Sequence, residues 1–200
     1  MVFGSSDIYD YKGAIRNLVS RDVIIVTIQY RLGFYGFFTT FTDDFPPNRA
    51  LYDQVRALEW IHEEIAHFGG DPSRVTIFGE SAGAVAVSAL SMSPLSQGFF
   101  HRVIQMSGSA TMEYGSPQDA FFDPSQVRAE KICGTTRLQW KAGDIQALRE
   151  CLAKKNPQDI VQYETVVAEG ALHYTEDPGS FDSRHTPTQP RCQPFVAGNW

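Results

Sequence analysis

Several features are scarce in this 200-residue chain, and each absence excludes a class of protein. No apolar run approaches the roughly 18–20 residues that a membrane-spanning helix needs, so no transmembrane segment is expected. The first residues contain neither a basic region nor an apolar core, so they do not form a signal peptide. Lysine and arginine total 17 against 23 acidic residues and do not cluster. Nucleic acid is therefore not an expected partner, because its binding rests on clustered positive charge.

Cysteine is also scarce. The chain contains Cys133, Cys151 and Cys192, and no Cys-x-x-Cys pair of the kind that binds metals. No metal site and no cofactor is therefore expected. From the residues alone, a cytosolic chain with three free thiols and an oxidised chain with a disulfide both stay open. No Asn-x-Ser/Thr glycosylation acceptor occurs either.

What the sequence does contain is the pattern of a folded α/β protein. Apolar residues make up 42% of the chain and aromatic residues 12%. The β-branched run at residues 23–28 does not alternate with polar residues, which predicts a strand buried on both faces. Apolar residues recur at helical spacing over residues 50–68. Strands are predicted at 75–78 and 103–106 with a small apolar helix at 84–90 between them, an order typical of a parallel sheet covered on both faces.

The character of the chain changes beyond residue 110. Amphipathic helices are predicted at residues 125–133 and 143–155, and the sequence after them is irregular and rich in proline. We therefore expect one incomplete domain over residues 1–200. Within it, residues 1–110 would form the core sheet and the catalytic turn, and residues 111–200 a helical and loop-rich excursion.

The chemical centre of the sequence is the motif Gly79-Glu80-Ser81-Ala82-Gly83, which lies between a predicted strand and a predicted helix. This is the context of a nucleophile elbow, in which a serine hydroxyl projects from a tight turn. Glycine at positions 79 and 83 is expected to remove Cβ atoms that would collide where the chain reverses. The amide of Ala82, at the start of the helix, would face the oxygen that becomes negative during acyl transfer. The alternative is a glycine-rich turn with an incidental serine.

Around this motif the sequence resembles a known family, the type-B carboxylesterases and cholinesterases of the α/β-hydrolase fold. The likeness extends from residue 2 to about residue 110. The resemblance implies a partial α/β-hydrolase fold, with a mostly parallel sheet and helices on both faces. It rests on residues 2–6, 22–33, 36–37, 48, 51, 53–54, 57–58, 60–61, 68–72, 75–83, 93–94, 100–102 and 107–109.

The resemblance also implies an activity, the hydrolysis of a small-molecule carboxylic ester through an acyl-enzyme on Ser81. Ala82 would be one oxyanion donor, and Glu80 is expected to be a buried, paired carboxylate. Cys133 and Cys151 resemble the disulfide pair of the family, which leaves Cys192 as a free thiol. A disulfide implies maturation in an oxidising compartment, so the protein is expected to be secreted or to reside in the lumen of the endoplasmic reticulum.

The chain also departs from the family pattern. Pro47 and Ala50 replace glycines, the glycine-rich oxyanion loop would precede Val2, and the family carries its acid and its histidine beyond Trp200. The histidines present are expected to be surface or loop residues, with His185 the best of the poor candidates for the base: His62, His67, His101, His173 and His185. The later carboxylates Glu176, Asp177 and Asp182 show none of the local pattern of the family's acid. We expect an incomplete copy of the domain that lacks its first and last strands, with activity only in the full-length form.

Two other functional hypotheses stay open. One is a catalytically silent relative of the esterases that acts by binding another protein, although the retention of Ser81 argues against it. The other is a 200-residue product that exists but is inactive or unstable. Whether the chain by itself is an enzyme is therefore left undecided by the sequence.

Overall fold

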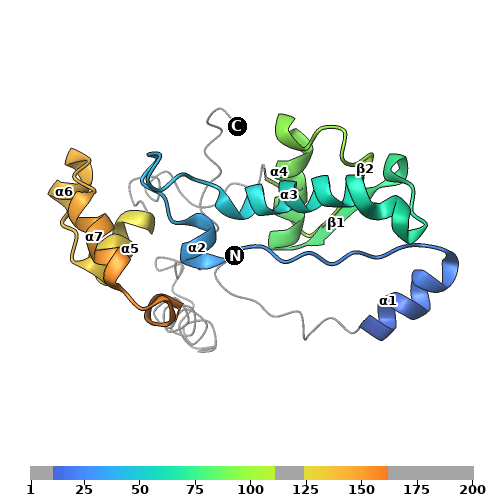
Figure 1. The fold of residues 1–200 in the computed structure, drawn as a ribbon, viewed down its shortest axis with the longest axis horizontal. Helices are drawn as coiled ribbons and strands as arrows, with labels where there is room; N and C mark the ends of the chain where they lie inside the picture. Colours follow the sequence, from blue (N-terminus) through green and yellow to red (C-terminus); the bar gives the residue numbers. More distant parts are fainter. Residues whose placement is uncertain (1–10, 111–123, 162–200) are drawn as a thin grey trace, which may run out of the picture. The chain divides into compact units, whose positions relative to one another are not determined.

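The computed structural model describes residues 11–110 and 124–161 (Figure 1). These residues divide into two compact units, which are treated separately. The sheet unit contains residues 11–31 and 50–110, and the helical unit contains residues 32–49 and 124–161. Among these residues no helix combines the length and the hydropathy that crossing a membrane would require.

The sheet unit is built on two parallel strands, β1 (Thr76–Glu80) and β2 (Arg102–Met106). Helix α4 (Ala82–Met92) follows β1 directly, and the 3-10 turn η5 (Pro94–Ser96) leads on to β2. In the register Phe78 lies opposite Ile104. The sequence prediction of two parallel strands joined through a small apolar helix is confirmed.

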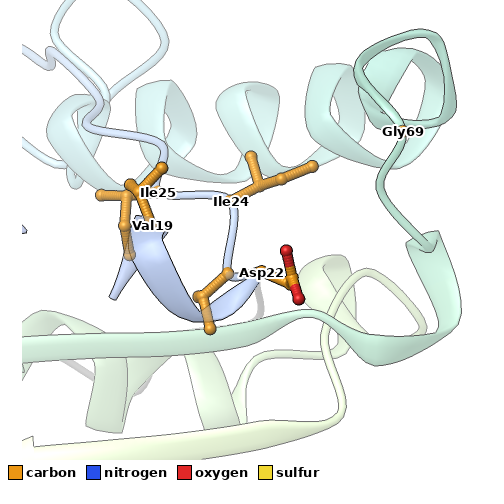
Figure 2. Close-up of a pocket in the computed structure, with 6 residues that line it drawn as sticks. Val19, Asp22, Ile24, Ile25 and Gly69 are labelled. Atoms are coloured by element: carbon orange, nitrogen blue, oxygen red, sulfur yellow. The ribbon is translucent and has the colours of Figure 1, made fainter. Parts of the chain in front are cut away.

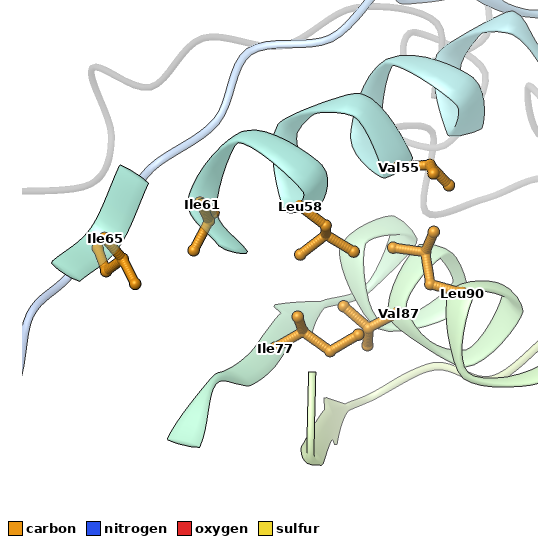
Figure 3. Packing of buried hydrophobic residues seen from close by; sticks show 7 residues of the cluster. All are labelled: Val55, Leu58, Ile61, Ile65, Ile77, Val87 and Leu90. Carbon is orange, nitrogen blue, oxygen red and sulfur yellow. The ribbon is translucent and has the colours of Figure 1, made fainter. Parts of the chain in front are cut away.

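Helix α3 (Arg49–Glu64) covers this sheet together with α4. It continues as the 3-10 turn η3 (Ile65–Phe68) and ends at Gly69, whose φ of 81° suits a residue without a Cβ atom. Its apolar residues recur every three or four positions and therefore share one face. Figure 3 shows how this face meets the strand and α4, in a core made of Val55, Leu58, Ile61, Ile65, Ile77, Val87 and Leu90.

The opposite face of the two strands is open to solvent within the described part of the chain. Ile77 points into the core and is 9% exposed, whereas Phe78 is 51% exposed. Its register partner Ile104 is 52% exposed. Because side chains alternate across a strand, the helices described here bury one set and leave the other uncovered.

The predicted strand at residues 23–28 is not formed, which corrects the sequence analysis. The segment follows α1 (Tyr11–Asn17) and η2 (Val19–Arg21) and contains no strand. A strand needs a hydrogen-bonded neighbour, and β1 and β2 pair with each other only among the described residues. Val23 and Ile24 are consequently 43% and 42% exposed.

One ion pair joins the segment after η2 to α3. The Arg31 guanidinium donates through Nε to Asp53 Oδ2 at 2.8 Å and through Nη2 to Asp53 Oδ1 at 2.6 Å. The backbone N–H of Arg31 donates to the same carboxylate at 2.9 Å. Such a bidentate pair fixes orientation as well as distance. Both residues belong to the set on which the family resemblance rests.

The helical unit contains α2 (Gly33–Phe37), α5 (Pro124–Cys133), α6 (Arg137–Ala142) and α7 (Gln146–Lys154). A further helical stretch occupies residues 157–161. The prediction of α5 is confirmed. The helix predicted over residues 143–155 starts later, because Gly143, with a φ of 69°, ends α6. The buried core of the unit consists of Phe34, Phe38, Ala129, Leu148 and Ile160.

Arg49 closes the carboxyl end of α2. Its guanidinium donates to the carbonyl oxygens of Phe38 at 2.8 Å, Tyr35 at 2.9 Å and Phe34 at 3.2 Å. The Phe34 carbonyl also accepts from the Phe38 N–H at 3.0 Å, and a cation at this end of the helix complements the helix dipole.

Burial raises the pKa of the Tyr35 phenol, which lies in the same unit.

Candidate active site

Ser81 occupies the turn between β1 and α4, where the sequence analysis places the nucleophile elbow (Gly79–Gly83). Its backbone has φ 53° and ψ −117°, a sparsely populated conformation for a residue with a Cβ atom. Holding such a conformation costs about 1–3 kcal/mol and persists where neighbouring structure fixes it. The serine is exposed, so its hydroxyl is accessible to solvent.

Backbone hydrogen bonds hold the turn at both ends. The Ser81 N–H donates to the Met106 carbonyl oxygen at 2.8 Å, which extends the pairing of β1 with β2. The Ser81 carbonyl oxygen accepts from the Val85 N–H at 3.1 Å in the first turn of α4. Ala82 is the first residue of that helix. The amides at such a position have no partner within the helix, which is what an oxyanion donor requires.

The two motif glycines differ in their steric need. A Cβ atom built on Gly79 would lie 2.3 Å from the carbonyl carbon and oxygen of Gly83, and 2.9 Å from the nitrogen of Ala84. A Cβ atom on Gly83 would meet no described atom within 4 Å. The collision expected at both positions is therefore present at Gly79 alone, because the strand there passes against the backbone of the helix start.

Gly108 is a residue of the elbow region to which the sequence analysis gave no role. A Cβ atom there would lie 2.5 Å from the Ser81 carbonyl oxygen. Nothing local in the sequence indicates this contact, since 27 positions separate the two residues. Only the parallel pairing of β1 with β2 places them together.

Glu80 is exposed, so the expectation of a buried, paired carboxylate is wrong for the described residues. Glu80 and Phe78 lie two positions apart on the same, uncovered face of β1. With no described element packed on that face, the carboxylate stays in water. Its place beside Ser81 in the sequence therefore does not bring it into the protein interior.

The described histidines lie on other parts of the sheet unit. His62 packs edge-on against Phe99, with 5.7 Å between ring centroids, and His67 Nδ1 lies 3.1 Å from Glu64 Oε2. His101 is exposed and lies just before β2. Within residues 11–110 and 124–161 no hydrogen bond joins the Ser81 hydroxyl to a histidine. His173, His185, Glu176, Asp177 and Asp182 lie outside the described residues.

A surface hollow of about 410 Å³ lies in the sheet unit, and Figure 2 shows the residues that line it. It is formed where the unpaired segment after η2 passes Gly69, and its lining is mainly aliphatic. The single carboxylate among the lining residues is that of Asp22. The lining residues are Val19, Asp22, Val23, Ile24, Ile25 and Gly69. Because none of them belongs to the elbow, this hollow is not the site around Ser81.

The Asp71 carboxylate, which precedes β1 in the sequence, accepts several hydrogen bonds. The Asp71 carboxylate accepts from the Ser73 N–H at 2.9 Å and from the Ser73 hydroxyl at 2.6 Å. It also accepts from Arg74 Nε at 2.8 Å. These bonds, those from Ser73 foremost, lower the pKa of Asp71. The Asp53 carboxylate in turn raises the pKa of Arg31.

The structure contains the disulfide that the resemblance implies. Cys133 at the end of α5 is bonded to Cys151 in α7, with Cα atoms 5.9 Å apart. Cys192 lies outside the described residues. No cluster of three or more metal-binding side chains occurs in the described ranges.

Comparison with known proteins identifies the family. The family model described as "Carboxylesterase family" matches residues 1–192, so the chain belongs to the carboxylesterase family. Carboxylesterase 5A of Homo sapiens is 42% identical over 158 residues, which cover 79% of this chain and 26% of the relative. Acylcarnitine hydrolase of Mus musculus is 40% identical over 161 residues, covering 80% and 27%. Acetylcholinesterase-1 of Trittame loki is 50% identical over 107 residues, covering 54% and 19%.

The chain spans about a quarter of the length of the two mammalian relatives. Family membership and the small parallel sheet with its helices together establish a partial α/β-hydrolase fold.

Proposed function

We propose that Ser81 is the nucleophile of a carboxylic ester hydrolase, acting in the full-length protein that contains this sequence. The observation that carries the proposal is the strained, exposed conformation of Ser81 between a strand and the first turn of a helix. Strain at a residue with a Cβ atom is retained where it serves a site. Relatives named carboxylesterase and acylcarnitine hydrolase support an ester substrate of small-molecule size.

The proposed reaction transfers the acyl group of the ester to Ser81 and then to water. Ser81 Oγ attacks the carbonyl carbon of the ester while a base takes the hydroxyl proton. The Ala82 N–H donates to the carbonyl oxygen as it becomes negative, at the positive end of the α4 dipole. The alcohol then leaves with the proton. Water attacks the acyl-enzyme in the same manner and releases the carboxylic acid and the free serine.

The proposal includes the cellular compartment in which the protein folds and forms its disulfide. The Cys133–Cys151 disulfide and the carboxylesterase relatives support a secreted protein or one of the endoplasmic reticulum lumen.

A fluorophosphonate probe tests the nucleophile, because it reacts with an activated serine hydroxyl. We expect the full-length protein to be labelled on the peptide that contains Ser81, and Ser81→Ala to abolish labelling and aryl-ester hydrolysis. Ser91→Ala is the matched control, since Ser91 is an exposed serine of α4, the helix that follows Ser81. Absence of labelling in the unaltered protein would contradict the proposal and favour a silent, protein-binding relative.

A further inference from the structure

The chain segment after β2 lies directly against the elbow. Beyond Met106, Ser107 takes a φ of 59° and turns the chain so that Gly108 lies against the Ser81 peptide. A Cβ atom on Gly108 would lie 2.5 Å from the Ser81 carbonyl oxygen, 3.1 Å from the Ala84 Cβ atom and 3.4 Å from the Ser81 carbonyl carbon. Real Cβ atoms do not approach a backbone oxygen so closely.

The need for glycine at this position is spatial. Gly108 is not among the glycines with positive φ, so an L-residue could adopt its backbone conformation. The obstacle is instead the backbone of Ser81, which cannot rotate away as a flexible side chain can. Accommodating a methyl group would require the backbones of Ser81 and Gly108 to move apart, because Cβ atoms essentially never approach another atom within 3.0 Å.

The Ser81 peptide is thus held on two sides by the same segment. The Met106 carbonyl accepts from the Ser81 N–H at 2.8 Å, and Gly108 lies so near the Ser81 carbonyl that a Cβ atom on it would be 2.5 Å from the oxygen. A residue in a sparsely populated conformation stays there only when its surroundings fix it. The segment after β2 supplies that constraint from outside the motif itself.

We propose that Gly108 is a positioning residue for the nucleophile, one that sets where the Ser81 hydroxyl points by allowing close approach to the Ser81 carbonyl. This rests on the proposed function, in which the Ser81 hydroxyl is the reacting group. A misplacement of about 1 Å at a reacting atom can cost on the order of 10²-fold in rate. The effect falls on the chemical step, because Gly108 acts on the serine backbone and not on the substrate.

The test compares Gly108→Ala with Gly13→Ala in the full-length protein. Gly13 is the matched control, because it also has no positive φ and a Cβ atom there meets nothing within 4 Å. We expect Gly108→Ala to slow fluorophosphonate labelling of Ser81 by roughly 10- to 100-fold. The kcat for an aryl ester should fall by the same factor while KM stays within about twofold. Gly13→Ala should match the unaltered protein in both measurements.

A second variant separates positioning from general packing. Adding Ala84→Gly to Gly108→Ala removes the methyl group at 3.1 Å and gives the new methyl room to lean away from Ser81. We expect this double variant to regain part of the labelling rate. It also replaces the single variant if that one fails to melt cooperatively.

The outcomes are distinct. Labelling of Gly108→Ala at the unaltered rate would overturn the positioning role while leaving the proposed function intact. Loss of folding in both the single and the double variant would also overturn it, since Gly108 would then serve general packing. Failure of the unaltered protein to react at Ser81 would instead defeat the proposed function.

Discussion

Ser81 shows how a single residue is kept in an unfavourable conformation by its neighbours. Its positive φ carries an energetic cost that a glycine would not have. Gly79 allows the strand to pass against the helix backbone, and the Met106 carbonyl fixes the Ser81 amide. The cost is therefore offset by contacts that would be lost if the turn relaxed.

A Cβ atom would collide with the backbone at Gly79 but not at Gly83, and this difference predicts opposite effects on stability. Gly79→Ala should lower the free energy of unfolding by about 1–3 kcal/mol or more, because its methyl overlaps the Gly83 backbone at 2.3 Å. Gly83→Ala should instead raise it by roughly 0.5–1 kcal/mol, since the site is open and lies in α4. Urea denaturation followed by circular dichroism measures both. Equal destabilisation by the two substitutions would contradict the structure.

Asp71 gives a prediction on pH. Its hydrogen bonds from Ser73 and Arg74 favour the charged form, so its pKa in the folded state lies below that of the unfolded chain. Its contribution to stability is present above the unfolded pKa of about 3.9 and is lost as the pH falls through the lower folded value. Carboxyl NMR titration of Ser73→Ala should show the pKa of Asp71 moving back up. An unchanged pKa would mean that Ser73 is not the main cause.

The sequence predicted part of this residue-level picture. The positions of Ser81 and Gly79 followed from the motif, because a local spacing encodes a local turn. Gly108 did not follow, since its contact depends on how two strands pair across 27 positions. The exposure of Glu80 was missed for a related reason, because burial depends on what packs on a face and not on the residue type.

At the scale of elements, α7 and α6 differ in that a leucine is buried in the first and a leucine is exposed in the second. Leu148 of α7 is 1% exposed and packs in the core of the helical unit, whereas Leu138 of α6 is 80% exposed. The helix α6 begins with a capping box, in which Thr136 and Gln139 exchange hydrogen bonds. Its start therefore depends on local polar contacts more than on the burial of Leu138.

This contrast gives a matched pair of substitutions within one unit. Leu148→Ala should lower the free energy of unfolding of the helical unit by about 2–5 kcal/mol, because it removes buried methyl groups and leaves a cavity. Leu138→Ala should change it by less than about 0.5 kcal/mol. Thermal melts followed by circular dichroism provide the comparison. Similar losses for both leucines would show that the core of this unit is placed wrongly.

Prediction from sequence succeeded for elements whose signal is local. The spacing of apolar residues located α3, and the small residues after Ser81 located α4. The β-branched run at residues 23–28 carried an equally strong signal for a strand, yet among the described residues it is unpaired. A strand depends on a neighbour elsewhere in the chain, whereas a helix satisfies its own hydrogen bonds.

At the scale of the whole molecule, the features predicted from the sequence are divided between the two units. The sheet unit carries the elbow, and the helical unit carries the disulfide and a separate aromatic core. Residues 32–49 group with the later helices in the helical unit. That grouping is invisible in the sequence because it comes from contacts such as the Thr39 N–H to Ser125 Oγ bond of 3.1 Å. The single-domain description of residues 1–200 stays a prediction.

The oxidation state of the cysteines tests whether the protein matures in an oxidising compartment. If the protein matures in an oxidising environment, alkylation without reductant should leave Cys133 and Cys151 unmodified, and alkylation after reduction should modify both. Mass spectrometry of the tryptic peptides distinguishes these cases. Modification of Cys133 and Cys151 without reductant, in protein taken directly from cells that express it, would contradict the proposed compartment.

The disulfide should also set how far the helical unit resists unfolding. Cys133 and Cys151 are 18 positions apart, and closing a loop of that size removes entropy from the unfolded chain worth about 3 kcal/mol. The double substitution Cys133→Ser/Cys151→Ser should therefore lower the free energy of unfolding by about that amount, while Cys192→Ser controls for loss of a thiol. The labelling of Ser81 provides an independent readout, because the elbow belongs to the sheet unit. An unchanged free energy of unfolding in the double variant would contradict this prediction, and lost labelling of Ser81 would show that the effect of the disulfide reaches the nucleophile.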